Sequence, residues 1–146
     1  MYVPRSDENV AECMSCELYQ QASFPEGTLW EIRRVLRPGG RLALSDLYLR
    51  NPGASSIPLA PPDTCLHGAV PLAVTLERLS EAGFAVRFWE DRSEALKSLV
   101  VSLIFSYGSS EEFRRASGGG SSSEEGLRQL RDARPGYYIL GADNGC

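Results

Sequence analysis

Residues 35–49, VLRPGGRLALSDLYL, decide the fold. Apolar residues recur at helical spacing over Thr28–Leu36, with charged residues between them, which predicts a short helix. Pro38-Gly39-Gly40 ends that helix, because proline cannot continue it and glycine readily adopts the left-handed cap. A strand is predicted over Arg41–Leu47, and its run Leu42-Ala43-Leu44 indicates that both of its faces are covered, as in a parallel sheet.

The rest of the chain continues the alternation of strands and helices. The further predicted elements are a strand at Asn9–Met14, a helix at Pro71–Ala82, a strand at Phe84–Glu90, a helix at Glu94–Phe105 and a strand at Gly136–Ala142. Phe84, Val86 and Phe88 are expected to share one face of their strand. Ser93 is expected to cap the helix that follows, and the apolar end of this helix predicts deep burial. This order favours an α/β fold.

The composition narrows the class of protein. The chain has 146 residues, enough for one domain, and its 42% hydrophobic and 23% charged residues are typical of soluble globular proteins. A net charge of −4 argues against broad binding to nucleic acids or anionic membranes. No apolar stretch approaches the roughly 20 residues of a membrane span. We recognise no leader peptide, so we expect a cytoplasmic location in which the four cysteines are thiols.

Three parts are expected along the chain. Residues 1–8 are polar and are predicted to be a flexible N-terminus. Residues 9–142 are predicted to form the folded domain. Within it, residues 116–126 include the run SGGGSSS, which predicts a flexible insert rather than a phosphate-binding loop.

The stretch Leu29–Asp46, which begins LWEIRRVLRPGG, resembles the helix-to-strand joint before the fifth strand of class I S-adenosylmethionine (SAM) dependent methyltransferases. Leu79–Phe84 resembles the helix end before their sixth strand, and Gly136–Ala142 resembles their seventh, antiparallel strand. Ala11–Ser15 falls where the fourth strand ends. Within that family, the chain is most similar to the arsenite and ubiquinone/menaquinone methyltransferases. The resemblance implies a partial Rossmann-like sheet of strands four to seven with flanking helices, and SAM as the cofactor.

The Gly-rich turn that holds SAM in these enzymes is missing from the sequence. No glycine group follows a strand, opens a helix and precedes a strand-end carboxylate. The resemblance therefore implies the C-terminal half of a methyltransferase that acts on a small molecule, with strand four left as an open edge. Three outcomes stay open: the chain forms a homo-oligomer, a missing N-terminal half completes it, or it is a truncated, non-catalytic remnant or interaction module.

The resemblance places four candidate site residues on the rim where strands four and five end. Glu12 and Cys13 would line the substrate pocket, Ser45 would bind substrate, and Asp46 would act as a base or hydrogen-bond acceptor. The alternative for Asp46 is a cap on the loop after the strand, since Asp is a common turn former. His67, the only histidine, is the other candidate base, and a solvated loop side chain is its alternative.

The remaining candidates are thiols. Cys13 and Cys16 are separated by two residues, and Cys65 is separated from His67 by one. Together they could bind zinc, although the second spacing is not usual for zinc sites. They could instead bind a soft substrate such as arsenic(III), and Cys65 is therefore a candidate substrate-binding residue. The favoured alternative is that the thiols are incidental, so no metal is expected.

Overall fold

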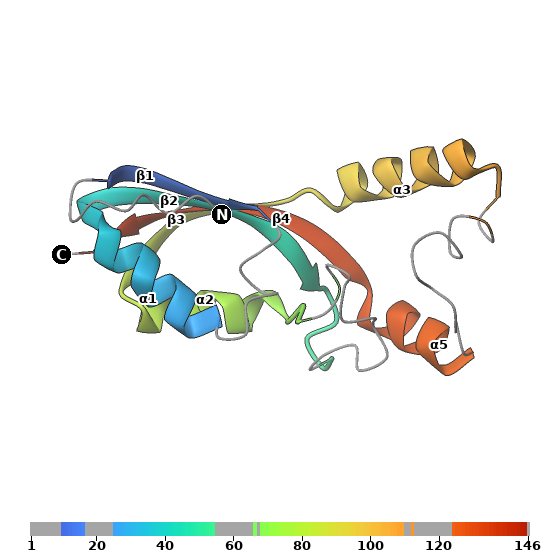
Figure 1. The fold of residues 1–146 in the computed structure, drawn as a ribbon. Helices are drawn as coiled ribbons and strands as arrows, with labels where there is room; N and C mark the ends of the chain where they lie inside the picture. Colours follow the sequence, from blue (N-terminus) through green and yellow to red (C-terminus); the bar gives the residue numbers. More distant parts are fainter. Residues whose placement is uncertain are drawn as a thin grey trace.

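The computed structural model describes residues 10–16, 25–54, 66, 68–109, 112 and 124–145 (Figure 1). The elements are β1 (Val10–Cys16), α1 (Pro25–Val35), β2 (Leu36–Leu49), α2 (Leu72–Glu81), β3 (Phe84–Asp91), α3 (Ser93–Tyr107), α5 (Glu124–Ala133) and β4 (Pro135–Asn144). The expected alternation of strands and helices is confirmed. Residues 1–8 and most of the 116–126 segment lie outside the described residues, and α5 already begins at Glu124.

The four strands form one sheet in the order β1-β2-β4-β3. β1 pairs with β2 in parallel, and Cys16 at the end of β1 lies beside Ser45. β4 is inserted antiparallel between β2 and β3, with Arg41–Leu49 paired to Pro135–Asp143. The prediction of a partial α/β sheet whose last strand is antiparallel is therefore confirmed.

Helices α1 and α2 cover one face of this sheet (Figure 1). Each presents an apolar stripe to the strands, because its apolar residues recur every three or four positions. The core between the two layers is made of the side chains Leu29, Ile32, Leu42, Leu44, Leu79, Tyr138 and Leu140, all at most 1% exposed. This buried apolar layer stabilises the fold by roughly 1.5–3 kcal/mol for each large side chain.

The Pro-Gly-Gly joint belongs to β2, which begins at Leu36 and not at the predicted Arg41. Leu36 pairs with Val10 of β1, so the strand starts as soon as α1 ends. Gly39 has a φ of +72°, a conformation that glycine adopts without strain. The next pair is Glu12 with Arg41, so the Pro-Gly-Gly residues lie in an irregularity of the β1–β2 register near the start of the strand.

Asn144 at the end of β4 fixes this joint. Its buried amide nitrogen donates hydrogen bonds to the carbonyl oxygens of Leu36 (2.9 Å), Arg37 (3.2 Å) and Arg33 (3.4 Å). Its amide oxygen accepts a hydrogen bond from Arg33 Nε at 3.2 Å. These carbonyls belong to the last turn of α1 and to the start of β2, which have no donor within the helix. One side chain therefore joins the C-terminal end of β4 to the helix-to-strand joint.

Replacing Asn144 with alanine should lower the free energy of unfolding by about 1–3 kcal/mol, because buried carbonyls lose their donor. Asn144→Asp keeps the shape but removes the donor, so it should be at least as destabilising at pH 7. Urea unfolding followed by circular dichroism measures both effects. A loss below about 0.5 kcal/mol for the alanine variant would show that Asn144 does not hold the joint.

The second face of the sheet is covered only in part. Leu47 and Leu49 near the end of β2 pack in a small cluster with Ala69 and Ala133. Nearer its start, β2 alternates between buried and exposed residues, and Ala43 is exposed. The expectation that both faces of the strand are covered is therefore wrong at Ala43, since α1 and α2 lie on the same side.

A bulge in β3 contradicts the expectation that Phe84, Val86 and Phe88 share one face. The register with β4 shifts between Val86 and Phe88, because Arg87 is an extra residue in the ladder. Phe88 therefore lies opposite Gly141 on the second face of the sheet and is 55% exposed, whereas Phe84 is buried. A one-residue shift moves each later side chain to the other face.

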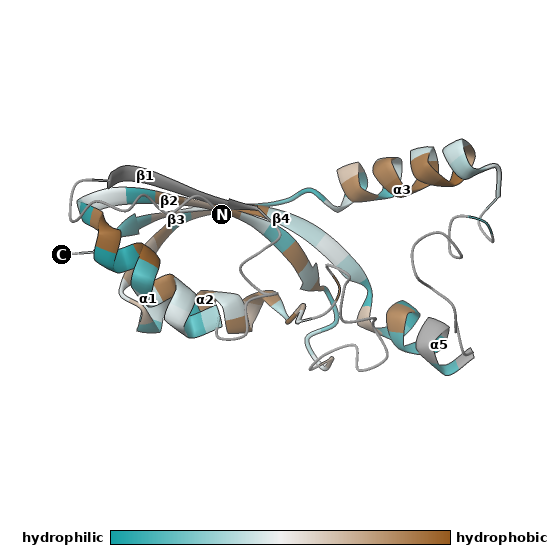
Figure 2. Ribbon diagram, in the orientation of Figure 1, coloured by the Kyte–Doolittle hydropathy of each residue, from teal (hydrophilic) through white to brown (hydrophobic). Residues whose placement is uncertain are grey.

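Helix α3 is exposed along most of its length, which contradicts the predicted deep burial. It begins at Ser93 rather than after it, and it extends beyond the α1–α2 layer (Figure 1). Apolar residues occupy most of its turns (Figure 2). Even so, Phe105 is 81% exposed and Leu99 is 55% exposed. Within the described residues, no helix combines the length and apolar character that crossing a membrane requires.

Candidate functional site

The candidate site lies where the parallel strands β1 and β2 run out toward their carboxyl ends, the edge at which open α/β sheets bind ligands. Ser45 of β2 lies beside the last residue of β1 and is half-buried. Tyr137 of β4 donates a hydrogen bond from its hydroxyl to Ser45 Oγ at 3.1 Å. Two hydroxyl groups from different strands therefore meet on the second face of the sheet, level with the end of β1, while β2 continues beyond them to Leu49.

Asp46 lies on the opposite face from Ser45. It is 1% exposed and pairs in register with Tyr138, which belongs to the core beneath α1 and α2. Its Oδ1 atom accepts a hydrogen bond of 2.8 Å from the backbone nitrogen of Leu47. The structure therefore does not bring the side chains of Ser45 and Asp46 together, and the catalytic role of Asp46 stays a prediction.

The resemblance placed Glu12 and Cys13 at the end of their strand. In the structure they lie within β1 instead. They pair with Arg41 and Leu42, and the strand continues to Cys16. At about 3.3 Å per residue, Cys13 is roughly 10 Å from the end of the strand. Their assignment to the substrate pocket stays a prediction.

Cys65 and His67 lie outside the described residues, so their predicted roles stay predictions. Among the residues that the structure describes, no group of three or more His, Cys, Asp or Glu side chains could hold a metal ion.

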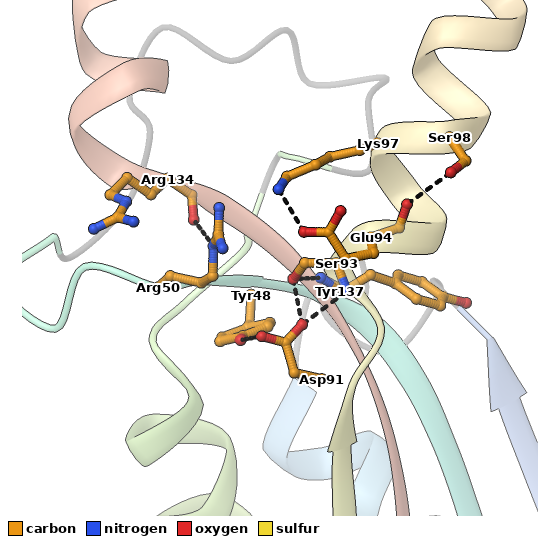
Figure 3. A network of polar contacts seen from close by, with 9 residues as sticks. All are labelled: Tyr48, Arg50, Asp91, Ser93, Glu94, Lys97, Ser98, Arg134 and Tyr137. Carbon is orange, nitrogen blue, oxygen red and sulfur yellow. Dashed lines mark hydrogen bonds and ion pairs between the residues drawn. The ribbon is translucent and has the colours of Figure 1, made fainter.

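A polar network that the sequence did not reveal reaches Tyr137 through its backbone (Figure 3). Asp91 Oδ1 accepts hydrogen bonds from the Ser93 backbone nitrogen, at 2.7 Å, and from the Ser93 hydroxyl. Asp91 Oδ2 accepts one of 3.0 Å from the Tyr48 hydroxyl. The backbone nitrogen of Tyr137 donates to Ser93 Oγ at 3.2 Å. The network therefore links the start of α3 to the strand that carries the site hydroxyl.

Two pKa values in this network are shifted. The hydrogen bond from the Ser93 hydroxyl holds the pKa of Asp91 below its usual value, helped by the Ser93 backbone and Tyr48. Burial raises the pKa of Tyr48, and its hydrogen bond to the Asp91 carboxylate adds to the effect. Both shifts favour an ionised Asp91 and a neutral Tyr48 at pH 7. The only local signal was Asp91-x-Ser93, a spacing that is common where a helix begins.

Asp91→Asn should destabilise the protein at pH 7 by about 1 kcal/mol, because the start of α3 loses a charged acceptor. The folded pKa of Asp91 lies below its unfolded value. Its contribution is therefore present above about pH 4 and is lost as pH falls through the folded pKa. The gap between wild type and variant should narrow from pH 7 to pH 3.5 in urea unfolding. A gap that stays constant with pH would contradict an ionised Asp91 in this role.

Gly136 is required where β4 passes the network. An added Cβ atom would lie 2.6 Å from Ser93 Oγ and 2.7 Å from Tyr48 Cε1. Real Cβ atoms essentially never lie that close to another heavy atom that is not bonded to them. Glycine at this point therefore allows the start of α3 and the ring of Tyr48 to approach the same backbone segment.

Gly136→Ala should lower the free energy of unfolding by about 1–3 kcal/mol, since the new methyl group forces Ser93 or Tyr48 to move. Gly53→Ala is the matched control, because a Cβ there would approach only Asn51 Oδ1, at 3.4 Å. Thermal unfolding of both variants measures the difference. Equal melting temperatures would show that the network tolerates the extra group.

A groove of about 620 Å³ lies at the other end of the sheet. Its lining includes Trp30, Arg33, Glu81 and Asn144, around the joint of α1 and β2. Arg33 packs over Gly83 and donates to Asn144, so it belongs to the structural joint. The groove lies at the amino end of β2, away from Ser45 and Tyr137.

Comparison with solved structures places this arrangement among known folds. The cyclase SpnF, described as a [4+2]-cyclase, superposes with a TM-score of 0.68 and 25% identity over 99% of this chain and 54% of its own. A phosphoethanolamine N-methyltransferase from Haemonchus contortus gives a TM-score of 0.65 and 13% identity over 97% of this chain and 34% of its own.

An arsenic(III) SAM methyltransferase from Chlamydomonas reinhardtii, CrArsM, gives a TM-score of 0.55 and 16% identity over 96% of this chain and 38% of its own. The chain has the methyltransferase fold. The methyltransferase fold implied by the stretch Leu29–Asp46 is thus confirmed. The chain spans between about a third and about half of the length of these three proteins. No protein-family model and no curated protein matches the sequence.

Proposed function

We propose that this chain is part of a SAM-dependent methyltransferase domain that acts on a small molecule. The carrying observation is the hydroxyl pair of Ser45 and Tyr137, which lies level with the carboxyl end of β1 on a methyltransferase-fold sheet. The Haemonchus enzyme was solved with S-adenosylhomocysteine, and a related structure of it was solved with SAM, which supports SAM as the cofactor here.

The described residues fit the substrate side of such a site better than the cofactor side. Gly39 and Gly40 lie inside β2, so they do not form a turn between a strand and a helix that could cradle the cofactor. We therefore assign no step to SAM on this chain. The hydroxyls of Ser45 and Tyr137 would hold a polar group of the acceptor, since methyl transfer depends mainly on positioning.

The other predicted residues complete this proposal. Glu12, Cys13 and Cys65 would line the acceptor pocket, and Asp46 or His67 would remove a proton from the acceptor where the chemistry needs a base. Asp46 would have to act from the helix-covered face, so His67 is the better candidate. A cytoplasmic location, in which the cysteines stay reduced, suits this proposal.

The cofactor side would come from additional polypeptide. β1 is at an edge of the sheet, and the second face is exposed at Ala43 and Phe88. An open edge invites a further strand, and a sheet with parallel strands is normally covered on both faces. The matched proteins are longer, since this chain covers only 54% of SpnF and 34% of the Haemonchus enzyme. We propose that an N-terminal half supplies the missing layer.

The alternative is a non-catalytic module that keeps the fold without the cofactor site. The lack of a Gly-rich turn in the sequence favours it. SpnF, described as a cyclase, is a reminder that a shared fold does not fix the chemistry.

Titration calorimetry with SAM tests the proposal. The folded 146-residue chain should show no saturable binding up to about 1 mM, because its sequence has no Gly-rich turn to hold the cofactor. Co-production with the polypeptide encoded upstream, or in a neighbouring frame with a strand–GxGxG–helix pattern, should restore binding. Saturable binding by the chain alone would contradict the need for a second part. No binding in either form would favour the non-catalytic alternative.

A further inference from the structure

Helix α3 has an apolar surface that no described part of the chain covers. It has no charged residue from Ser98 to Tyr107. Its large exposed side chains are Leu99 (55%), Val101 (51%), Phe105 (81%) and Tyr107 (48%). The half-buried residues Leu96, Val100, Leu103 and Ile104 lie together on the other side of the helix. An isolated exposed Leu is ordinary, but an uncharged apolar surface that continues from Ser98 to Tyr107 marks an interaction site.

The outward surface of α3 consists of parallel rows of residues spaced four apart. One row is Lys97, Val101 and Phe105, with the large ring at its end. The neighbouring row is Ser98, Ser102 and Ser106, all small and exposed. The helix therefore presents a ridge directly beside a shallow groove.

The serine row behaves as a nearly apolar groove. The hydroxyl of Ser98 donates to the Glu94 carbonyl at 3.0 Å, and that of Ser106 donates to the Ser102 carbonyl at 2.9 Å. Because these two donors are used within the helix, a partner can cover Ser98 and Ser106 without leaving their hydroxyls unpaired.

We propose that α3 is an interface with a second copy of this chain. The two helices pack antiparallel about a two-fold axis between Val101 and Ser102. Phe105 and Ser98 are each 3.5 positions from that axis, so Phe105 of one copy fits against Ser98 of the other. A single surface that carries both the projecting ring and its groove is self-complementary, as a two-fold symmetric interface requires.

The charges of α3 agree with this arrangement. Lys97 would lie at the level of Ser106 of the second copy, in the last turn of that helix. That turn has no basic residue of its own, and a cation is favourable at a helix C-terminus. In each copy Lys97 forms an ion pair with Glu94, so the rest of the interface stays uncharged. A single basic residue does not favour an anionic lipid surface as the partner.

The size of α3 limits the strength of the dimer. Fifteen residues give a helix about 22 Å long, so the contact lies below the roughly 1,200 Å² of standard interfaces. We therefore expect reversible association that depends on concentration. This inference does not rest on the proposed methyltransferase function.

Sedimentation equilibrium over about 5–500 µM tests the dimer, since weak interfaces dissociate in this range. The mass should rise from 16.0 kDa toward twice that value. Phe105→Ser and Ser98→Phe should each weaken dimerisation at least about tenfold, because one loses the ring and the other fills the groove. The double variant exchanges ring and groove, so it should recover to within about threefold of wild type.

Trp30→Ser is the control, since Trp30 is another exposed aromatic side chain (63%) on α1, away from α3. It should leave dimerisation unchanged. The changed side chains are exposed, so circular dichroism should show the same fold in all variants. A wild-type chain that stays at 16.0 kDa throughout would overturn the proposal. A double variant that remains as weak as the single ones, or an equal loss in Trp30→Ser, would overturn it as well.

Discussion

The backbone ladder between β2 and β4 is the interaction on which the rest of the structure depends. Nine residues of each strand pair from Arg41–Asp143 to Leu49–Pro135, and β3 is attached to the sheet only through β4. Strand β4 contains Tyr137 of the candidate site, Gly136 beside the polar network and Asn144 at the helix-to-strand joint. A shift of one residue in this ladder would move all three to the wrong face.

The sequence predicted the order and type of the elements, because each has its own apolar period and its own glycine or proline boundary. It did not predict the bulge at Arg87 or the start of β2 at Leu36, since both depend on pairing with strands distant in sequence. The burial of α3 was mispredicted for a related reason. An apolar helix signals that something must cover it, but not whether the same chain supplies the cover.

The candidate site was predictable in part. The resemblance placed Ser45 where its strand ends; the structure instead continues β2 to Leu49 and brings Ser45 into contact with Tyr137. The side chains of adjacent residues in a strand point to opposite faces, so Ser45 and Asp46 could not both serve one surface. The Tyr137 partner is 92 residues away from Ser45 in sequence, and no local pattern reveals such a contact.

The position of β4 in the sheet also bears on how the chain folds as it is made. β4 is the last of the described strands to be synthesised, yet it lies between β2 and β3, both translated earlier. Until it emerges from the ribosome, β3 has no partner, and β2 has only β1. Non-local closure of this kind is slow and leaves strand edges open meanwhile. The nascent chain therefore exposes one edge of β2 and both edges of β3 until β4 is inserted between them.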